Sequence, residues 1–323
     1  MKRALITGIA GQDGSYLAEL LVSLGYEVHG VVRKETLEGG VFGLSNLESI
    51  IDDVHLHGIS IDSYQGLSAL ISACDPHECY HLASESYVSH DLNDGHELVS
   101  TMFSRAQALL SAIKSHAPDC RVFFAGSSEM YGLAITSPQN EATAFRPRSN
   151  YGIGKVAAYH FGRAKRDLGD LFFSTAFLYN HESARRSPRF VTRKVTSAVA
   201  RIHLGSKEKL VLGNLNAKRD WGYAPDYVAA MHATLQQKEP QDFVLGTGEL
   251  RSVRELVATA FSTVNLNYDD FVETDPKFFR ANEAVPLCAD ASKARQVLGF
   301  KNTKEFNQII VEMVEADINR YKS

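Results

Sequence analysis

The sequence lacks the features of a secreted, membrane or nucleic-acid-binding protein. Its cysteines, Cys74, Cys79, Cys120 and Cys288, show neither the CxxC spacing of zinc sites nor the density of a disulfide scaffold. Apolar runs are too short for a secretory signal or a bilayer span. With 34 basic and 38 acidic residues, the net charge of −4 gives no positive field for a nucleic-acid backbone. We expect a cytoplasmic protein with reduced, mostly buried cysteines, no bound metal, and no nucleic-acid or membrane partner.

What the first half does contain is a series of short apolar runs separated by segments of helical periodicity. The runs are ALIT, VHGVV, VHLHG, CYHLA and RVFFAG. This alternation is typical of parallel strands joined by crossover helices. It predicts an α/β fold with a Rossmann-like, doubly wound parallel sheet, whose ligands bind at the carboxyl ends of the strands.

Beyond residue 170 the pattern is less regular. We expect a strand from Phe172 to Leu178, a helix from about Phe190, and short segments such as KLVLG and DFVLG. Residues 1–170 should form the dinucleotide-binding core, and residues 171–323 mainly a smaller C-terminal α/β substrate lobe, with some segments returning to the core. Because no Pro- or Ser-rich linker separates them, we expect one continuous hydrophobic core with a cleft between the two parts.

Three glycines lie between the first expected strand and an amphipathic helix, in the run TGIAGQDGSYL. Glycine lets the backbone approach a pyrophosphate, which the amides at the helix N-terminus can bind. A tight turn without a ligand would also use glycine, but the preceding strand and following helix favour a dinucleotide site. We expect cofactor contacts from Gly8, Gly11, Gln12, Asp13 and Gly14.

The end of the second expected strand carries two cations where an acidic residue would bind the ribose hydroxyls of NAD. The run there is Val-Val-Arg33-Lys34. Cations at this position favour the 2′-phosphate of NADP, with NAD as the other possibility. Solvated basic residues after a strand would give the same pattern. We expect Arg33 to contact the cofactor.

Tyr151 and Lys155 are the strongest candidates for catalysis. They are four residues apart at the start of an expected helix, which places them on one face. An ammonium group beside a phenol stabilises the phenolate, so we expect Lys155 to lower the pKa of Tyr151 toward working pH. The pair predicts proton transfer coupled to hydride transfer, and both residues should also contact the cofactor.

The run GSSEMYG follows the fifth expected strand and should place Ser127, Ser128 and Glu129 at the same edge of the sheet. Ser127 can hydrogen-bond a substrate hydroxyl beside Tyr151. Glu129 would supply a second acid/base, able to take a carbon-bound proton. Its alternative role is that of an exposed glutamate at the start of a loop.

Together these residues resemble the extended short-chain dehydrogenase/reductase family, of the NAD-dependent epimerase/dehydratase type. Longer runs resemble the GDP-mannose 4,6-dehydratases within it, and they cover the chain nearly end to end. These runs are TGIAGQDGSYLAELL, GSSEMYG, PRSNYGIGK, NHESARRSPRFVTRKVT, LGNLNAKRDWGYAPDYV and DPKFFRANEAVPLCADASKARQVLGF.

The resemblance implies a redox-neutral lyase acting on GDP-mannose in deoxysugar biosynthesis. Tyr151 would take the O4 proton while the C4 hydride passes to NADP, Glu129 would take the C5 proton as water leaves C6, and hydride would return to C6. It also implies a homodimer or homotetramer. The expected contacts to the sugar nucleotide are Ser86, Asn180, Glu182, Arg185, Lys194, Arg219 and Arg280, the last two to its phosphates.

Guanidinium groups suit a diphosphate because they bind its oxygens bidentately. The arginine-rich run could instead be a solvated basic helix face; its cations are Arg185, Arg186, Arg189, Arg193 and Lys194.

The fourth strand departs from the family pattern near the expected nicotinamide and hexose. His81, Glu85 and Tyr87 stand where Asn, Gln and His are usual. Two alternatives therefore stay open. One is a 4-reductase or 4-dehydrogenase of a related GDP-sugar, a 6-deoxyhexose or heptose. The other is a non-catalytic protein that senses the dinucleotide.

Overall fold

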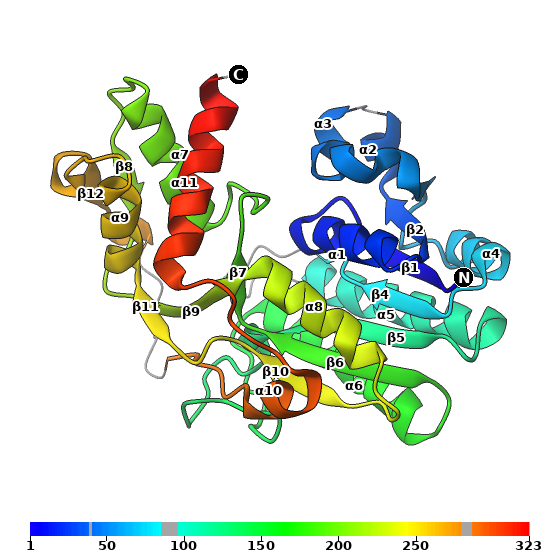
Figure 1. The fold of residues 1–323 in the computed structure, drawn as a ribbon. Helices are drawn as coiled ribbons and strands as arrows, with labels where there is room; N and C mark the ends of the chain where they lie inside the picture. The colour runs from blue at the N-terminus through cyan, green and yellow to red at the C-terminus, as the bar shows by residue number, and fades with distance from the viewer. Residues whose placement is uncertain (39–40, 85–95, 279–285, 323) are drawn as a thin grey trace.

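A seven-stranded parallel sheet is the centre of the computed structural model, which describes residues 1–38, 41–84, 96–278 and 286–322 (Figure 1). The strand order within these residues is β10-β6-β5-β4-β1-β2-β3. Every neighbouring pair runs parallel. The strands are β1 Arg3–Thr7, β2 Glu27–Val32, β3 Val54–Gly58, β4 Glu78–His81, β5 Arg121–Ser127, β6 Phe172–Leu178 and β10 Asp242–Leu245.

The apolar runs form strands because both faces of the sheet are covered. Ala4, Leu5 and Ile6 in β1 are all fully buried, although they alternate between the two faces. The expected strands at ALIT, VHGVV, VHLHG, CYHLA and RVFFAG are confirmed, as is the strand from Phe172 to Leu178, and the short segments KLVLG and DFVLG also form strands. The fold class is therefore the predicted doubly wound α/β sheet.

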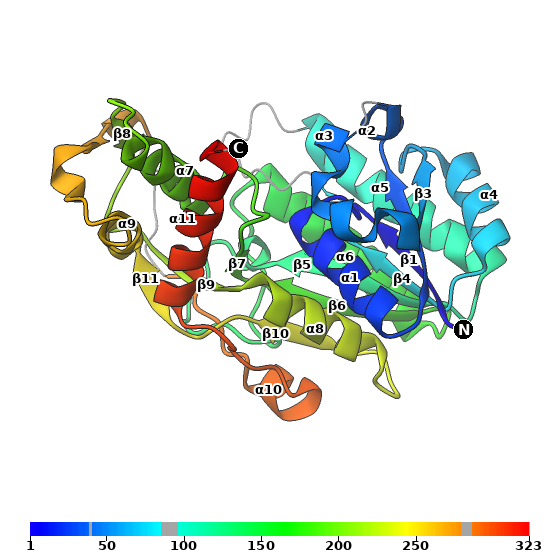
Figure 2. The same cartoon turned by 45° about the horizontal axis from the view of Figure 1, so that its top comes forward.

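Helices pack on each face of this sheet (Figure 2). One face carries α4 Tyr64–Cys74, α5 His96–His116 and α6 Asn150–Asp167, whose apolar residues share a core with the sheet. The other face carries α1 Gln12–Ser23, α8 Ala224–Leu235 and α10 Ser292–Leu298. After β2 come α2 Lys34–Glu38, α3 Val41–Leu44 and the 3-10 helix η1 Ser45–Asp53; the other 3-10 helices are η2 Ser128–Met130, η3 Tyr268–Asp270 and η4 Pro276–Phe278.

The order of the strands reverses at β1, which lies between β2 and β4. The connections on either side of this point diverge, which leaves a crevice at the carboxyl ends of the strands. The glycine-rich run between β1 and α1 opens into this crevice.

A smaller lobe lies beside the sheet, on the left in Figures 1 and 2. Its strands are β7 Asn180–Glu182, β8 Leu210–Leu212, β9 Lys218–Tyr223, β11 Leu250–Ser252 and β12 Val272–Thr274, paired within the described residues as β11-β9-β7 and β12-β8. Its helices are α7 Val191–His203, α9 Val253–Ser262 and α11 Phe306–Lys322. Phe190 is the N-cap residue of α7, which confirms the helix expected from about that position.

The expectation of one continuous hydrophobic core is wrong. The lobe has a core of its own, in which Val195, Leu256 and Met313 are buried, separate from the two cores on the faces of the sheet. Where α1 meets β7 the contacts are polar, between Gln12 or Asp13 and His181, while the Tyr227 ring of α8 stacks on His181.

A buried ion pair holds α7 against α11 within the lobe. The Arg193 Nε donates to both carboxylate oxygens of Asp317, at 2.7 and 2.8 Å. Thr196, Ser197 and Arg320 also donate to this carboxylate. Since Asp317 is fully buried and Arg193 only 7% exposed, this part of the arginine-rich run is not a solvated helix face.

Cys74, Cys79 and Cys120 are buried and Cys288 is partly exposed, and all four are free thiols, as expected. Within the part of the chain that the structure describes, no helix is long and apolar enough to cross a membrane. The same residues contain no cluster of three His, Cys, Asp or Glu side chains able to hold a metal ion.

We expect Asp317→Asn to lower the free energy of unfolding by about 3–5 kcal/mol, because the amide leaves Arg193 buried without its counter-charge. Urea denaturation of the ligand-free protein measures this loss. Glu315→Gln is the matched control, since Glu315 is exposed on the same helix. Equal effects of the two substitutions would contradict the prediction.

Candidate active site

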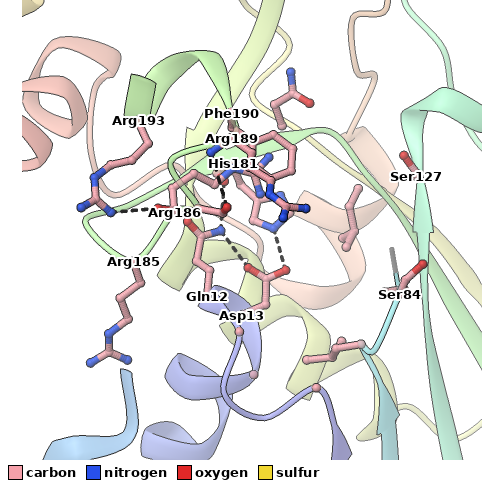
Figure 3. Close-up of a pocket in the computed structure, with 18 of the residues that line it drawn as sticks. Gln12, Asp13, Ser84, Ser127, His181, Arg185, Arg186, Arg189, Phe190 and Arg193 are labelled. Atoms are coloured by element: carbon pink, nitrogen blue, oxygen red, sulfur yellow. Dashed lines mark hydrogen bonds and ion pairs between the residues drawn. The ribbon is translucent and has the colours of Figure 1, made fainter. Parts of the chain in front are cut away.

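A cleft of about 1190 Å³ lies between the carboxyl edge of the sheet and the lobe (Figure 3). Ser86 and Arg280 lie outside the described residues. All the other predicted site residues line the cleft: Gly8, Gly11, Gln12, Asp13, Gly14, Arg33, Ser127, Glu129, Tyr151, Lys155, Asn180, Glu182, Arg185, Lys194 and Arg219. The structure therefore brings together residues that are far apart in the sequence.

The glycine-rich loop is too tightly folded to accept a side chain at Gly8 or Gly14. Gly8 has φ +78°, and a Cβ added at Gly14 would lie 2.3 Å from the carbonyl oxygen of Gly8. Gly11, the N-cap residue of α1, provides no side-chain cap for the helix amides. The first turn of α1 therefore faces the cleft with backbone donors suited to a phosphate, as this dinucleotide fingerprint requires.

The cleft continues past the end of β2, where Arg33 and Lys34 are exposed. Among the described residues, Arg33 has no carboxylate partner. A neighbouring carboxylate, Asp62, is bound by Arg105 through two hydrogen bonds of 2.6 and 2.9 Å, which hold its pKa below the usual range. This end of the cleft is therefore positively charged and can accept a phosphate.

The start of α6 packs directly against the end of β5. Ser149 caps the helix by accepting a hydrogen bond from the amide of Gly152 at 3.1 Å. A Cβ at Gly152 would lie 2.6 Å from the carbonyl oxygen of Glu129, so this close approach requires glycine. It brings Tyr151, in the first turn of α6, to the same part of the cleft as Ser127 and Glu129.

Lys155 is 4% exposed, and its Nζ donates to the carbonyl oxygen of Ala125 at 2.7 Å. The ammonium lies 4.9 Å from the ring centroid of Phe124 and 5.8 Å from that of Tyr151. Burial lowers the pKa of Lys155 to about 7. At neutral pH the side chain therefore exchanges readily between its charged and neutral forms.

The expectation that Lys155 brings the pKa of Tyr151 toward neutrality is wrong for the protein alone. Burial raises the pKa of Tyr151 to about 12, although a hydrogen bond with Ser127 acts in the opposite direction and the Glu129 charge adds to the increase. The ammonium points to a backbone carbonyl, and its own charge is reduced near pH 7. Further positive charge is needed before Tyr151 can act as a base.

Glu129 has one buried carboxylate oxygen, Oε2, with no hydrogen-bond partner among the described residues. Its backbone amide donates to the Ser127 Oγ at 3.2 Å, which fixes the turn after β5. A buried unpartnered acceptor costs about 1–3 kcal/mol. Glu129 thus has the position of an acid/base residue rather than of an exposed loop glutamate.

His81 does not line the cleft, although the residues after it do. Its Nδ1 lies 2.8 Å from the Thr7 Oγ1. Burial lowers its pKa to about 3, assisted by the charges of Lys155 and Arg105, so the ring is neutral. That this departure lies near the nicotinamide stays a prediction for His81, while Glu85 and Tyr87 lie outside the described residues.

Two predicted sugar-nucleotide contacts are engaged within the protein instead. The Glu182 carboxylate is 2% exposed; it accepts a hydrogen bond from Thr192 and pairs with Arg186 at 3.2 Å. The Arg185 guanidinium is turned toward α1, where it binds Ser15 and Glu19 at 3.1 and 2.6 Å. Both residues shape the wall of the cleft, and neither presents a free charged group to a ligand.

Lys194 and Arg219 present positive charge on the lobe side of the cleft. The Lys194 Nζ donates to the carbonyl of Val211, and Arg219 donates to the carbonyl of Lys218, both at 2.7 Å. Both side chains line the lobe side of the cleft, where a cation can attract an anionic substrate.

Sequence reasoning missed Arg105 and Asp62, which lie far apart in the chain, and also His181. The sequence did contain a signal for His181, because this residue stands between the predicted site residues Asn180 and Glu182 in β7. Side chains alternate along a strand, so the His181 side chain lies on the other face of β7 from those two neighbours. Figure 3 shows this imidazole against Asp13.

Comparisons with known proteins agree with this geometry. The family described as GDP-mannose 4,6 dehydratase matches residues 5–313. GDP-mannose 4,6 dehydratase 2 of Arabidopsis thaliana is 41% identical over 333 residues, covering 99% of this chain and 88% of that protein.

Two solved structures share the fold at low sequence identity. The dTDP-glucose 4,6-dehydratase of Bacillus anthracis in complex with NAD has a TM-score of 0.84 at 19% identity, covering 100% of this chain and 98% of that one. The UDP-glucose 4-epimerase of Thermotoga maritima with UDP-glucose has a TM-score of 0.84 at 22% identity, covering 99% of each chain.

The low pKa of Lys155 makes the stability of the ligand-free protein depend on pH. The unfolded chain keeps this proton up to about pH 10.5, its ordinary pKa, whereas the folded protein loses it near pH 7. Between these values the unfolded state binds more protons, so stability rises with pH. In the wild type the free energy of unfolding should therefore rise by at most about 1.4 kcal/mol per pH unit. We expect this rise to be absent in Lys155→Met.

Urea denaturation at pH 7, 8 and 9 measures this effect as the difference between the wild-type and variant curves. Lys238→Met, at an exposed site away from the cleft, is the control. Parallel curves for the wild type and Lys155→Met would contradict the assignment.

Proposed function

Because the chain belongs to the GDP-mannose 4,6-dehydratase family, we propose that it converts GDP-mannose to GDP-4-keto-6-deoxy-mannose with NADP as its bound cofactor. The observation that carries this function is the meeting of Tyr151, Ser127 and Glu129 in one cleft, with Glu129 Oε2 buried and unpartnered. Hydride transfer alone needs Tyr151 and Ser127. The glutamate adds the base that dehydration requires.

The cleft residues fit a nicotinamide dinucleotide. Gly8, Gly11 and Gly14 leave room for a pyrophosphate at the start of α1. Arg33, with Lys34 beside it, supports NADP over NAD because a 2′-phosphate needs a cationic partner. When bound, a nicotinamide dinucleotide would supply positive charge and would hold the hydride between its removal from C4 and its addition to C6.

Tyr151 takes the O4 proton in the first step. Its pKa of about 12 in the protein alone falls when positive charge is added nearby, so the phenol becomes a base only in the loaded site. Ser127 orients the same hydroxyl by hydrogen bonding. Lys155, close to its pKa of about 7, supplies or accepts the proton behind the phenol.

Glu129 acts in the second stage. A ketone at C4 acidifies the C5 proton, which Glu129 Oε2 takes while the C6 hydroxyl leaves as water after protonation by an acid in the cleft. Hydride then reaches C6, and the protonated Glu129 returns a proton to C5. The proton that Tyr151 took from O4 restores the acid that protonated the leaving hydroxyl, so the sum is the loss of one water, with no net oxidation or reduction.

The lobe would hold the nucleotide part of the substrate. Arg219 and Lys194 supply positive charge to the diphosphate, which carries about two negative charges. Asn180 lines the same wall. Ser86 and Arg280, outside the described residues, remain proposed contacts.

We further propose a homodimer or homotetramer located in the cytoplasm. The outer surfaces of α5 and α6 support an oligomer, since Ile153 is 37% exposed and the partly exposed rings of Phe103 and Phe161 meet there with centroids 5.7 Å apart. The free thiols support a reducing compartment.

We expect Glu129→Gln to reduce the kcat for dehydration by about 10²–10⁴-fold, because an amide cannot take the C5 proton. Mass spectrometry of GDP-mannose incubations in D₂O follows both water loss and solvent deuterium at C5. Tyr151→Phe should block the earlier step as well, so only Glu129→Gln should develop the 340 nm absorbance of a cofactor reduced once. Glu239→Gln, an exposed substitution, is the control.

Unchanged turnover in Glu129→Gln would remove this residue from the mechanism. Stoichiometric and lasting consumption of added NADPH by the wild type would contradict dehydration and favour a 4-reductase of a related GDP-sugar.

We expect Arg219→Ala to raise the KM for GDP-mannose by a factor equivalent to about 1.5–3 kcal/mol, the loss of one charge-assisted contact. Initial-rate kinetics measure it. Arg251→Ala is the matched control, since Arg251 in β11 stands directly opposite Arg219 in the antiparallel register with β9 but does not line the cleft. Equal KM values for the two variants would place the diphosphate elsewhere.

A further inference from the structure

A carboxylate occupies the end of α1 that the cofactor phosphates need. Asp13 is the second residue of this helix; it lines the cleft, and its side chain is only 22% exposed. A helix N-terminus attracts anions, so a carboxylate and a diphosphate placed there compete and repel each other. The charge of Asp13 therefore needs compensation before a dinucleotide can bind well.

His181 supplies the compensating charge from β7. Its Nε2 lies 2.9 Å from the Asp13 Oδ2, and its Nδ1 lies 2.7 Å from the carbonyl oxygen of Tyr179. Each of these oxygens is an acceptor, so both ring nitrogens carry hydrogen and the ring is an imidazolium. Burial acts to lower the pKa of His181, but Asp13 raises it above its ordinary value.

The surroundings of the pair hold the imidazolium in place. Its ring stacks on Tyr227, with centroids 4.5 Å apart and an angle of 22° between the planes. Another cation, Arg186, also lowers the pKa of Asp13 through its charge, but its own ion pair is with Glu182, at 3.2 Å.

Gln12 completes the connection between α1 and β7. Its Nε2 donates to the Asp13 Oδ1 and to the carbonyl of His181, at 3.0 and 3.1 Å, and its Oε1 accepts from Ser183 at 2.9 Å. The loop that holds the cofactor is thus joined to the strand that carries Asn180, as Figure 3 shows around Asp13 and His181.

We propose that His181 is a positioning residue for the reaction, whose imidazolium neutralises Asp13 at the phosphate-binding end of α1 and fixes β7 against the cofactor loop. The affinity for the cofactor and the position of β7, which carries Asn180, then depend on the ion pair between His181 and Asp13. The inference rests on the proposed function for the identity of the substrate, but cofactor binding tests it independently.

The experiment compares the dissociation constant of NADP, by fluorescence titration, for wild type, His181→Gln, Asp13→Asn and the double variant. We expect His181→Gln to weaken binding roughly tenfold or more, because glutamine keeps a hydrogen bond but leaves the carboxylate charge unopposed beside the phosphates. Asp13→Asn should bind at least as tightly as wild type. The double variant should recover binding to within about threefold, since neither charge remains.

His29→Gln is the matched control, because His29 also pairs with a carboxylate, that of Glu27 at 3.1 Å, but does not line the cleft. A merely structural role for His181 would make the double variant as weak as His181→Gln or weaker, which would overturn the proposal. Weaker binding by Asp13→Asn would also overturn it, and this variant gives a result even if His181→Gln does not fold.

A second measurement separates this inference from the proposed function. At saturating NADP, His181→Gln should raise the KM for GDP-mannose, because β7 loses its tie to α1; an unchanged KM would overturn the positioning of β7. If wild type binds NADP but dehydrates no GDP-mannose, the proposed function fails while the NADP titrations still decide the role of Asp13 and His181.

Discussion

Parallel strand pairing is the constraint on which the rest of this structure depends. Each parallel pair needs a crossover helix, so the carboxyl ends of β1, β4 and β5 all lie at one edge of the sheet. The turn after β1 carries the glycine loop, Ser127 ends β5, and Glu129 lies in the turn that follows it. One edge of the sheet thereby gathers the residues that would hold a dinucleotide and those that would act on a substrate.

Burial at that edge then determines the chemistry of the gathered residues. It lowers the pKa of Lys155 to about 7 and raises that of Tyr151 to about 12, so burial favours the neutral form of both side chains. It also leaves Glu129 Oε2 without a partner. Burying these side chains costs free energy of folding, and such costs are common at sites where reactive groups are needed.

Polar contacts, rather than a shared core, connect the sheet to the lobe. The core of the lobe is separate, and α1 meets β7 through Gln12, Asp13, His181 and Ser183. Directional bonds of this kind define a relative position more closely than apolar packing does, because each requires a particular distance and angle. The wall formed by Asn180 and Glu182 is therefore placed with respect to the glycine loop.

The sequence predicted the sheet, its strands and most of the residues proposed for the site, although Asp62, Arg105 and His181 also line the cleft. Apolar runs of strand length, the glycine spacing at Gly8 and Gly14, and the helical spacing of Tyr151 and Lys155 are local patterns, and local patterns follow from backbone geometry. The partners of these residues became clear only in the folded structure. Arg185 binds Glu19 on α1 and Asp13 meets His181, because charges far apart in the chain come within reach of each other only when the chain folds. Glu182 binds Arg186, four residues along.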